Sequence, residues 1–118
     1  MWDRYNMSAQ QAMSQGKATD AENFFRMALA EAEKMPPNDP KLLTTLNNLA
    51  NCLRQQGRFS DAEPLYKKAI ALREKASGLH SKDLAILLEN YAKMLRLAGR
   101  TPEAEKIDSR VLAIYSKN

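Results

Sequence analysis

Three glycines at nearly equal spacing constrain the fold of this chain more than any other feature of its sequence. Gly16, Gly57 and Gly99 are separated by 41 and 42 residues, and a similar segment surrounds each of them. The three segments are QGKATDAENFFRMA at 15–28, QGRFSDAEPLYKKA at 56–69 and, less well preserved, AGRTPEAEKIDSRV at 98–111. Self-similarity at a fixed period indicates that one unit of about 42 residues has been used three times.

Each unit carries two stretches in which apolar residues recur at intervals of three and four. Before the second glycine these residues are Leu42, Leu43, Leu46, Leu49, Ala50 and Leu53. This spacing places them on one face of an α-helix. A second helical stretch follows each glycine, and no segment shows the sustained alternation that is typical of a strand. We therefore predict an all-α protein of six helices in three helix-turn-helix units.

The residues around each glycine predict how the two helices of a unit are joined. A residue just past a helix end often needs a left-handed backbone, which glycine adopts without strain, so Gly57 is expected to end a helix. A hydroxyl residue followed three positions later by glutamate predicts a capping box at the start of the next helix. The residues given this role are Ser60 with Glu63, Thr19 with Glu22, and Thr101, which precedes Pro102 at the expected first helical position.

The length and charge of the chain favour a single folded domain. The 118 residues carry a formal net charge of +4, and hydrophobic residues make up 44% of the sequence. No apolar run approaches the roughly 18 residues that a membrane-spanning helix needs. The N-terminal stretch also lacks the basic and apolar regions of a signal peptide. We therefore expect a cytoplasmic protein that does not insert into a membrane.

The sequence offers no constellation that predicts catalysis. It contains one cysteine, Cys52, and one histidine, His80, which lies in a loop-like stretch. A single Cys and a distant single His make a weak metal site, and we expect a buried thiol and a surface imidazole. With no glycine-rich phosphate loop either, we predict that the protein is not an enzyme and uses no metal or other cofactor.

The repeated residues resemble the tetratricopeptide repeat. That pattern has a small residue in the first helix, glycine at the turn, and alanine, an aromatic residue and alanine in the second helix. The second unit matches it with Ala50, Gly57, Ala62, Tyr66 and Ala69. The usual period is about 34 residues, and the longer unit seen here is similar to the repeats of kinesin light chains.

This resemblance implies a right-handed superhelical solenoid formed by one domain of three repeats. We place the repeats at about 1–37, 40–78 and 81–117 of the 118 residues. Arrays of this kind usually close with a capping helix, and none is evident after Tyr115. Two explanations stay open: the chain is a fragment of a longer protein, or its last helix associates with a second copy.

The resemblance also implies a binding surface, because the first helices of such repeats form a concave groove that holds peptide segments. The groove positions lie on the helix face opposite the apolar stripe. They are Asn47, Asn48, Asn51, Arg54, Glu89, Asn90, Lys93 and Arg96, together with Asn6 and Gln10 of the first unit. The expected function is that of a non-enzymatic scaffold that binds a peptide segment of a partner protein.

The chemistry of these residues suggests what such a partner would offer. Asn48 and Asn90 recur in register, and an amide can both donate to and accept from a peptide backbone. Arg54, Lys93 and Arg96 would favour an acidic partner. In the alternative interpretation, the asparagines bridge neighbouring helices and the arginines lie on a solvated face.

Two other functions stay open at this point. A basic helical-repeat protein could contact RNA, but no aromatic stacking platform recurs among the groove positions, so nucleic acid is the less favoured partner. The apolar residues of the last helix could instead make the chain a self-associating assembly module.

Overall fold

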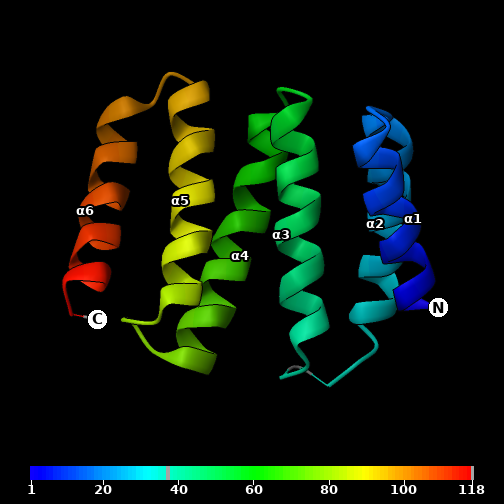
Figure 1. The fold of residues 1–118 in the computed structure, drawn as a ribbon, viewed down its shortest axis with the longest axis horizontal. Coiled ribbons are helices and arrows are strands. Elements are labelled where there is room, and N and C mark those ends of the chain that lie inside the picture. Colours follow the sequence, from blue (N-terminus) through cyan, green and yellow to red (C-terminus); the bar gives the residue numbers. More distant parts are fainter. Residues whose placement is uncertain (37, 118) are drawn as a thin grey trace.

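The computed structural model describes residues 1–36 and 38–117, and this part of the chain contains six helices and no strand. The helices are α1 (Trp2–Ser14), α2 (Ala18–Ala32), α3 (Pro40–Gln55), α4 (Phe59–Ser77), α5 (Lys82–Leu97) and α6 (Thr101–Lys117). Figure 1 shows them following one another across the molecule in chain order. The predicted all-α solenoid of three helix-turn-helix units is confirmed.

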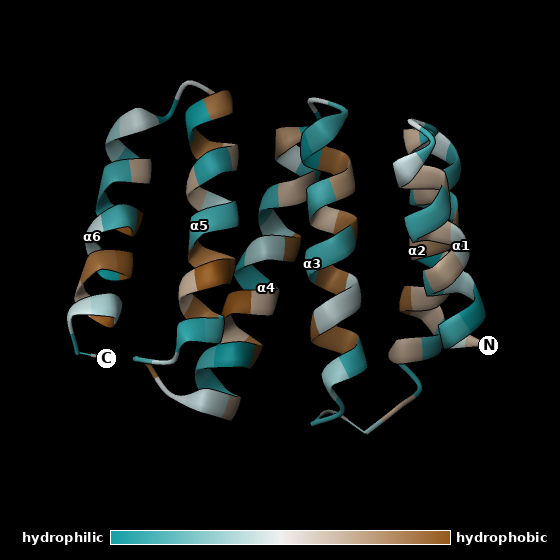
Figure 2. Ribbon diagram, viewed as in Figure 1, coloured by the Kyte–Doolittle hydropathy of each residue, from teal (hydrophilic) through white to brown (hydrophobic). Residues whose placement is uncertain are grey.

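Each helix packs against the next one in the chain through its apolar face. Figure 2 shows the alternation of hydrophobic and hydrophilic segments along the helices that this packing requires. The alanines that follow the glycine turns are completely buried: Ala21, Ala62 and Ala104. The leucines of the predicted apolar stripe, Leu46, Leu49 and Leu53, are at most 1% exposed. Small residues at the three alanine positions let the paired helices approach closely.

Gly57 ends the first helix of its unit as predicted. It has a φ of 75°, and the glycines of the other two turns have φ values of 74° and 79°. The Gly57 N–H donates to the Arg54 carbonyl at 2.9 Å, and the Arg58 N–H donates to the Leu53 carbonyl at 2.9 Å. These two bonds form a Schellman motif, which satisfies the last carbonyls of α3.

The predicted capping boxes at Ser60 and Thr19 are wrong. Helix α4 begins at Phe59 and α2 at Ala18, so both hydroxyl residues lie inside the first turn and no side chain in the described part of the chain caps either helix. The Ala62 N–H already donates to the Arg58 carbonyl at 3.1 Å, which shows that the helix starts directly after the glycine turn.

The start of α6 differs from the prediction by one residue. Thr101 is the first helical residue, and Pro102 is therefore the second. The Ala104 N–H donates to the Arg100 carbonyl at 3.1 Å, so the hydrogen-bonded ladder begins at Arg100. Proline is still tolerated here, because the first turn of a helix has no internal acceptor for its N–H groups.

A tryptophan at the N-terminal end connects the first and third helices. The Trp2 indole N–H donates to the Thr45 hydroxyl at 2.7 Å, and that hydroxyl, completely buried, donates to the Lys41 carbonyl at 2.6 Å. The Lys41 ammonium lies 5.6 Å from the centre of the indole ring. Helix α1 is therefore attached to α3 directly as well as through α2.

The side chains of Cys52 and His80 lie where the sequence placed them. Cys52 is buried between units, where its thiol donates to the Ala18 carbonyl at 3.3 Å, and His80 is exposed. The last helix, α6, is only partly covered: Val111 and Ile114 are buried, whereas Leu112 is 67% exposed. None of the helices in the described part of the chain combines the length and apolar character needed to cross a membrane.

Candidate functional site

The ten predicted groove residues lie on the first helix of each unit. They are Asn6 and Gln10 on α1, Asn47, Asn48, Asn51 and Arg54 on α3, and Glu89, Asn90, Lys93 and Arg96 on α5. Figure 1 shows α1 and α3 in front of α2 and α4. Helix α3 contacts α5 directly, and Trp2 and Asn6 of α1 are hydrogen-bonded to side chains of α3. We call the surface formed by α1, α3 and α5 the wall.

Asparagine side chains bridge the helices of this wall at both steps. The Asn48 amide donates to the Asn6 side-chain oxygen at 3.4 Å, and the Asn90 amide donates to the Asn47 side-chain oxygen at 3.4 Å. All four side chains are half-buried. The bridging role that was the alternative interpretation is therefore present. An amide has two donors and two acceptor lone pairs, so one bridge leaves capacity for a ligand.

Asn51 is held in the same wall by the second helix of its own unit. Its side-chain oxygen accepts from the hydroxyl of Tyr66, a residue of α4 that is completely buried. Burial raises the pKa of Tyr66 to about 12, so this phenol stays a donor at neutral pH. The Tyr66 ring also lies 6.0 Å from the ring of Tyr91 on α5. The orientation of Asn51 is therefore fixed by the core.

Arg54 lies one helical turn beyond Asn51 and makes the wall basic. Its Nη1 atom is enclosed by protein and has no acceptor among the described residues. A buried donor without an acceptor costs about 1–3 kcal/mol. The accessible part of this half-buried guanidinium can form a charge-assisted hydrogen bond with an anionic group.

Arg96, which the sequence also predicted as a basic residue of the groove, already pairs with an acidic side chain of α6. Its guanidinium donates to both carboxylate oxygens of Asp108 on α6, and this pairing raises the pKa of Arg96. Glu89 is also engaged, since the Tyr115 hydroxyl donates to it at 2.6 Å. These contacts hold α5 against α6. Among the predicted basic residues, Arg54 and the exposed Lys93 are the ones that lack a carboxylate partner in the part of the chain described here.

The sequence did not reveal the ion pairs that join one unit to the next. At the first joint, Glu22 on α2 is 7% exposed and accepts from Arg58 at 2.5 Å and from Arg26 at 2.9 Å. Gln56 donates to the same carboxylate at 3.2 Å. Burial alone would raise the pKa of Glu22, but the hydrogen bonds from Arg26 and Gln56 and the charge of Arg58 lower it.

The second joint repeats this arrangement with Glu63 on α4. Arg100 donates to its two oxygens at 2.9 and 2.8 Å, and the Tyr91 hydroxyl donates to it at 2.7 Å. The hydrogen bonds from Arg100 lower the pKa of Glu63 to about 2. The available sequence signal was that Glu22 recurs as Glu63 and Arg58 recurs as Arg100, each one repeat later.

The remaining metal-binding side chain types do not cluster in the part of the chain that the structure describes. No three His, Cys, Asp or Glu side chains in residues 1–36 and 38–117 come together as a metal site requires. Burial raises the pKa of the Cys52 thiol, which makes it a poor nucleophile. The chemistry available on the wall is therefore hydrogen bonding and charge.

Comparison with known families gives two overlapping matches. Two profiles of the tetratricopeptide repeat match the chain, one at residues 5–75 and the other at residues 47–118. No curated protein sequence matches the chain significantly. The first match alone covers more than half of the residues.

Solved structures with the same fold include repeat proteins assigned to a kinesin light chain. Two crystal structures of nearly identical TPR-like repeats, assigned to a kinesin light chain of Podosopora anserina, superpose with TM-scores of 0.85 and 0.84 at 20% and 19% identity. BtubC (BKLC) from P. vanneervenii superposes with a TM-score of 0.92 at 25% identity. The matches cover 98%, 98% and 99% of this chain but 55%, 56% and 46% of those chains, so it spans about half their length.

Proposed function

Because the chain belongs to the tetratricopeptide repeat family, whose members generally mediate protein–protein interactions, we propose that it binds an extended peptide segment of a partner protein. The segment lies along the wall formed by α1, α3 and α5. The observation that carries the proposal is the row of bridged asparagines, which leads along the wall to the half-buried cation Arg54. The protein acts as a scaffold, and the wall supplies no catalytic group.

The asparagines suit an extended backbone because their remaining donors and acceptors do not depend on the ligand's side chains. Asn48 and Asn90 use one amide N–H each in the bridges to Asn6 and Asn47. The other amide groups of this row can pair with the N–H and carbonyl groups of a peptide. Since the bridges fix the side chains before binding, little rotamer entropy is lost when the peptide arrives.

Arg54 gives the proposed site its preference for acidic segments. A carboxylate on the peptide would pair with the accessible part of the half-buried Arg54 guanidinium. The formal net charge of +4 assists the encounter with an acidic segment. Arg96 contributes less than the sequence suggested, because Asp108 already neutralises it.

A random-peptide display library tests this proposal, because it samples many segments and requires no particular partner protein. The immobilised 118-residue protein is expected to enrich peptides with at least one Asp or Glu. Arg54→Glu should weaken the enriched peptides by more than about tenfold, since it replaces the cation with a like charge. The double variant Asn48→Ala, Asn90→Ala should weaken them regardless of their side-chain sequence.

Lys68→Glu is the matched control, because Lys68 is an exposed cation on α4, outside the wall. It makes the same change in net charge as Arg54→Glu and should alter affinity by less than twofold. If Lys68→Glu and Arg54→Glu weaken binding equally, the peptides recognise net charge and not the wall. Failure to enrich any peptide would reject the proposal.

Self-association through α6 is a second candidate, favoured by one observation. Leu112 on α6 is 67% exposed, whereas Ile70, which occupies the equivalent position in the second unit, is 7% exposed. Sedimentation velocity over a wide concentration range should then show dimers that Leu112→Lys abolishes. A monomer at every concentration would remove this candidate.

A further inference from the structure

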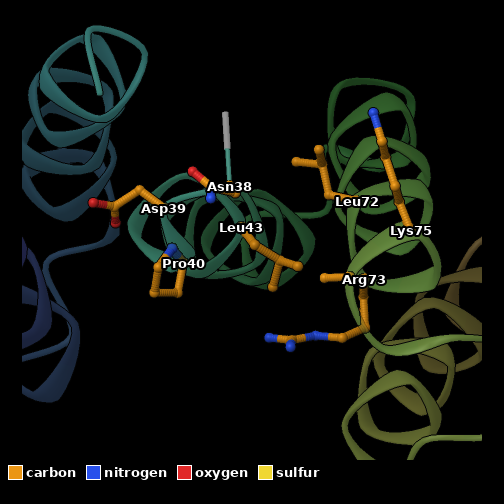
Figure 3. A pocket seen from close by; sticks show the side chains of 8 residues that line it. Asn38, Asp39, Pro40, Leu43, Leu72, Arg73 and Lys75 are labelled. Atoms are coloured by element: carbon orange, nitrogen blue, oxygen red, sulfur yellow. The ribbon is translucent and has the colours of Figure 1, made fainter. Parts of the chain in front are cut away.

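The structure contains a cavity that none of the groove residues lines. It lies between the start of α3 and the end of α4, at the end of the hairpin away from the Gly57 turn, and has a volume of about 360 Å³. Figure 3 shows the side chains around it. Cavities of a few hundred Å³ with mainly apolar walls and a few polar groups are typical of small-ligand sites.

The walls of the cavity are mostly apolar. Leu43 on α3 and Leu72 on α4 line it from the two helices, and Figure 3 shows both side chains extending into the space between these helices. Pro40 and Ala76 complete the apolar lining. Leu43 and Leu72 pack against the core and are only half-buried themselves, so an apolar group between them would remove exposed hydrocarbon surface from water.

Arg73 supplies the polar group of the cavity. Its side chain is 23% exposed, and its Nε atom is enclosed and has no acceptor among the described residues. The Nη1 atom has only long contacts, 3.3 Å to the Ser77 hydroxyl and 4.0 Å to Asp83. Figure 3 shows the guanidinium extending from α4 toward α3, beside Leu43. A buried cationic donor therefore borders an apolar space.

The charges around the cavity favour an anion. The lining contains the cations Arg73 and Lys75 and the single acid Asp39. One oxygen of Asp39 is occupied as the cap of α3, where it accepts from the Lys41 N–H at 2.9 Å. Lys75 extends away from Arg73 in Figure 3, so Arg73 is the cation placed to contact a ligand.

We propose that this cavity binds a compact apolar group that carries a carboxylate. The apolar part lies between Leu43 and Leu72, and the carboxylate accepts from the outer N–H groups of the Arg73 guanidinium, whose Nη1 atom has only long contacts within the chain. The planar fork of a guanidinium matches the geometry of a carboxylate. This site is independent of the wall on α1, α3 and α5, so either can fail without the other.

Hydrocinnamate and its neutral amide, hydrocinnamamide, are a matched pair of probes for the site. Titration into the isotope-labelled 118-residue protein is followed by NMR. Hydrocinnamate should bind in the millimolar range or slightly tighter, as expected for so small a ligand, and shift the methyl resonances of Leu43 and Leu72. The amide should bind about tenfold more weakly, since it lacks the charge. Equal binding of the two probes, or shifts elsewhere in the protein, would overturn the proposal.

Three variants locate the site. Arg73→Gln should reduce hydrocinnamate affinity about tenfold and leave the weak amide binding unchanged. Lys75→Gln removes one positive charge from the same rim but should change affinity by less than twofold. Ala76→Leu adds bulk to the cavity and should abolish binding of both probes. Circular dichroism checks that each variant is folded. Equal losses for Arg73→Gln and Lys75→Gln would show that net charge alone acts, and would overturn the proposal.

The carboxylate could come from a free acid or from the C-terminus of a peptide. A short peptide that ends in phenylalanine with a free carboxylate competes with hydrocinnamate if peptide ends are bound, and fails to compete if only free acids fit. Both results support the proposal and identify the source. Competition by the same peptide with an amidated end, at equal strength, would contradict it.

Discussion

The two joints between units use the same ion pair but differ in what surrounds it. Glu22 pairs with Arg58 between α2 and α3, and Glu63 pairs with Arg100 between α4 and α5. In the third unit the equivalent acid, Glu105, is exposed on α6. Burial of the acid at the other two positions therefore comes from the unit that follows it.

The packing around the two pairs is different in kind. The first joint adds polar contacts, with Gln56 donating to Glu22 and the Cys52 thiol donating to the Ala18 carbonyl. The second joint has the larger Met94 at the position equivalent to Cys52, completely buried, and Tyr91 donates to Glu63. Both joints therefore contain the Glu–Arg ion pair, while the size of the buried side chain beside it differs between them.

The largest expected difference between the joints comes from truncating their buried side chains. Met94→Ala should destabilise the protein by about 2–5 kcal/mol, because it leaves a cavity in the second joint. Cys52→Ala removes much less volume and should cost about 1 kcal/mol. Urea unfolding monitored by circular dichroism measures both. Equal losses would contradict the difference in packing between the joints.

Neutralising the glutamate of a joint tests whether the Glu–Arg ion pair, which both joints contain, stabilises the protein. Glu63→Gln keeps the shape of the side chain but removes its charge, and should cost about 1–2 kcal/mol because Arg100 loses one of its two charged acceptors and keeps only Glu103. Glu105→Gln is the control at the equivalent exposed position and should change stability by less than about 0.5 kcal/mol. Chemical denaturation at neutral pH is the measurement. If the two variants behave alike, the ion pair does not stabilise the joint.

Acid titration should reveal how much the ionised Glu63 carboxylate stabilises the fold, because low pH protonates this carboxylate in the wild-type protein. The pKa of Glu63 is lowered from 4.5 to about 2, so its carboxylate stabilises the fold above pH 4.5 and this contribution is lost as the pH falls toward 2. The stability difference between the wild type and Glu63→Gln should therefore shrink over that range. Denaturation curves at intervals of pH measure it, and a constant difference would show that the pKa is not lowered.

The smallest expected loss of stability comes from removing the Tyr91 hydroxyl, which donates to Glu63 in the second joint. Tyr91→Phe removes the hydrogen bond to Glu63 but keeps the ring and the pairing with Arg100. We expect a loss of about 0.5–1.5 kcal/mol, measured by the shift in thermal unfolding. A loss as large as that of Glu63→Gln would mean that Tyr91, and not Arg100, satisfies the acid.

The sequence predicted the helices and their turns because the relevant physics is local. The three-and-four spacing of leucines in α3 and the glycine at position 57 determine a helix and its end without reference to the rest of the chain. The same local logic produced the errors at Ser60 and Thr19. Glu63 fits a capping box three residues after Ser60, but its partner in space is Arg100, which is 37 residues away.

The candidate site could be predicted only to the level of the helix face. The sequence placed Asn48, Asn90 and Arg54 on the first helices, and the structure has them there. It could not distinguish Arg54 from Arg96, because the difference lies in Asp108, a residue of another helix that neutralises only Arg96. The cavity beside Arg73 had no sequence signal, since its lining joins the two ends of one hairpin.

The most direct test of peptide binding at the wall is to observe its side-chain amides during a titration. A peptide enriched from the display library is added to the labelled protein, and the amide resonances of Asn48, Asn51 and Asn90 are followed by NMR. We predict that these shift together, while the exposed amide of Asn23 on α2 stays unchanged. Shifts at Asn23 with none on α3 and α5 would contradict the proposal that the first helices bind the partner.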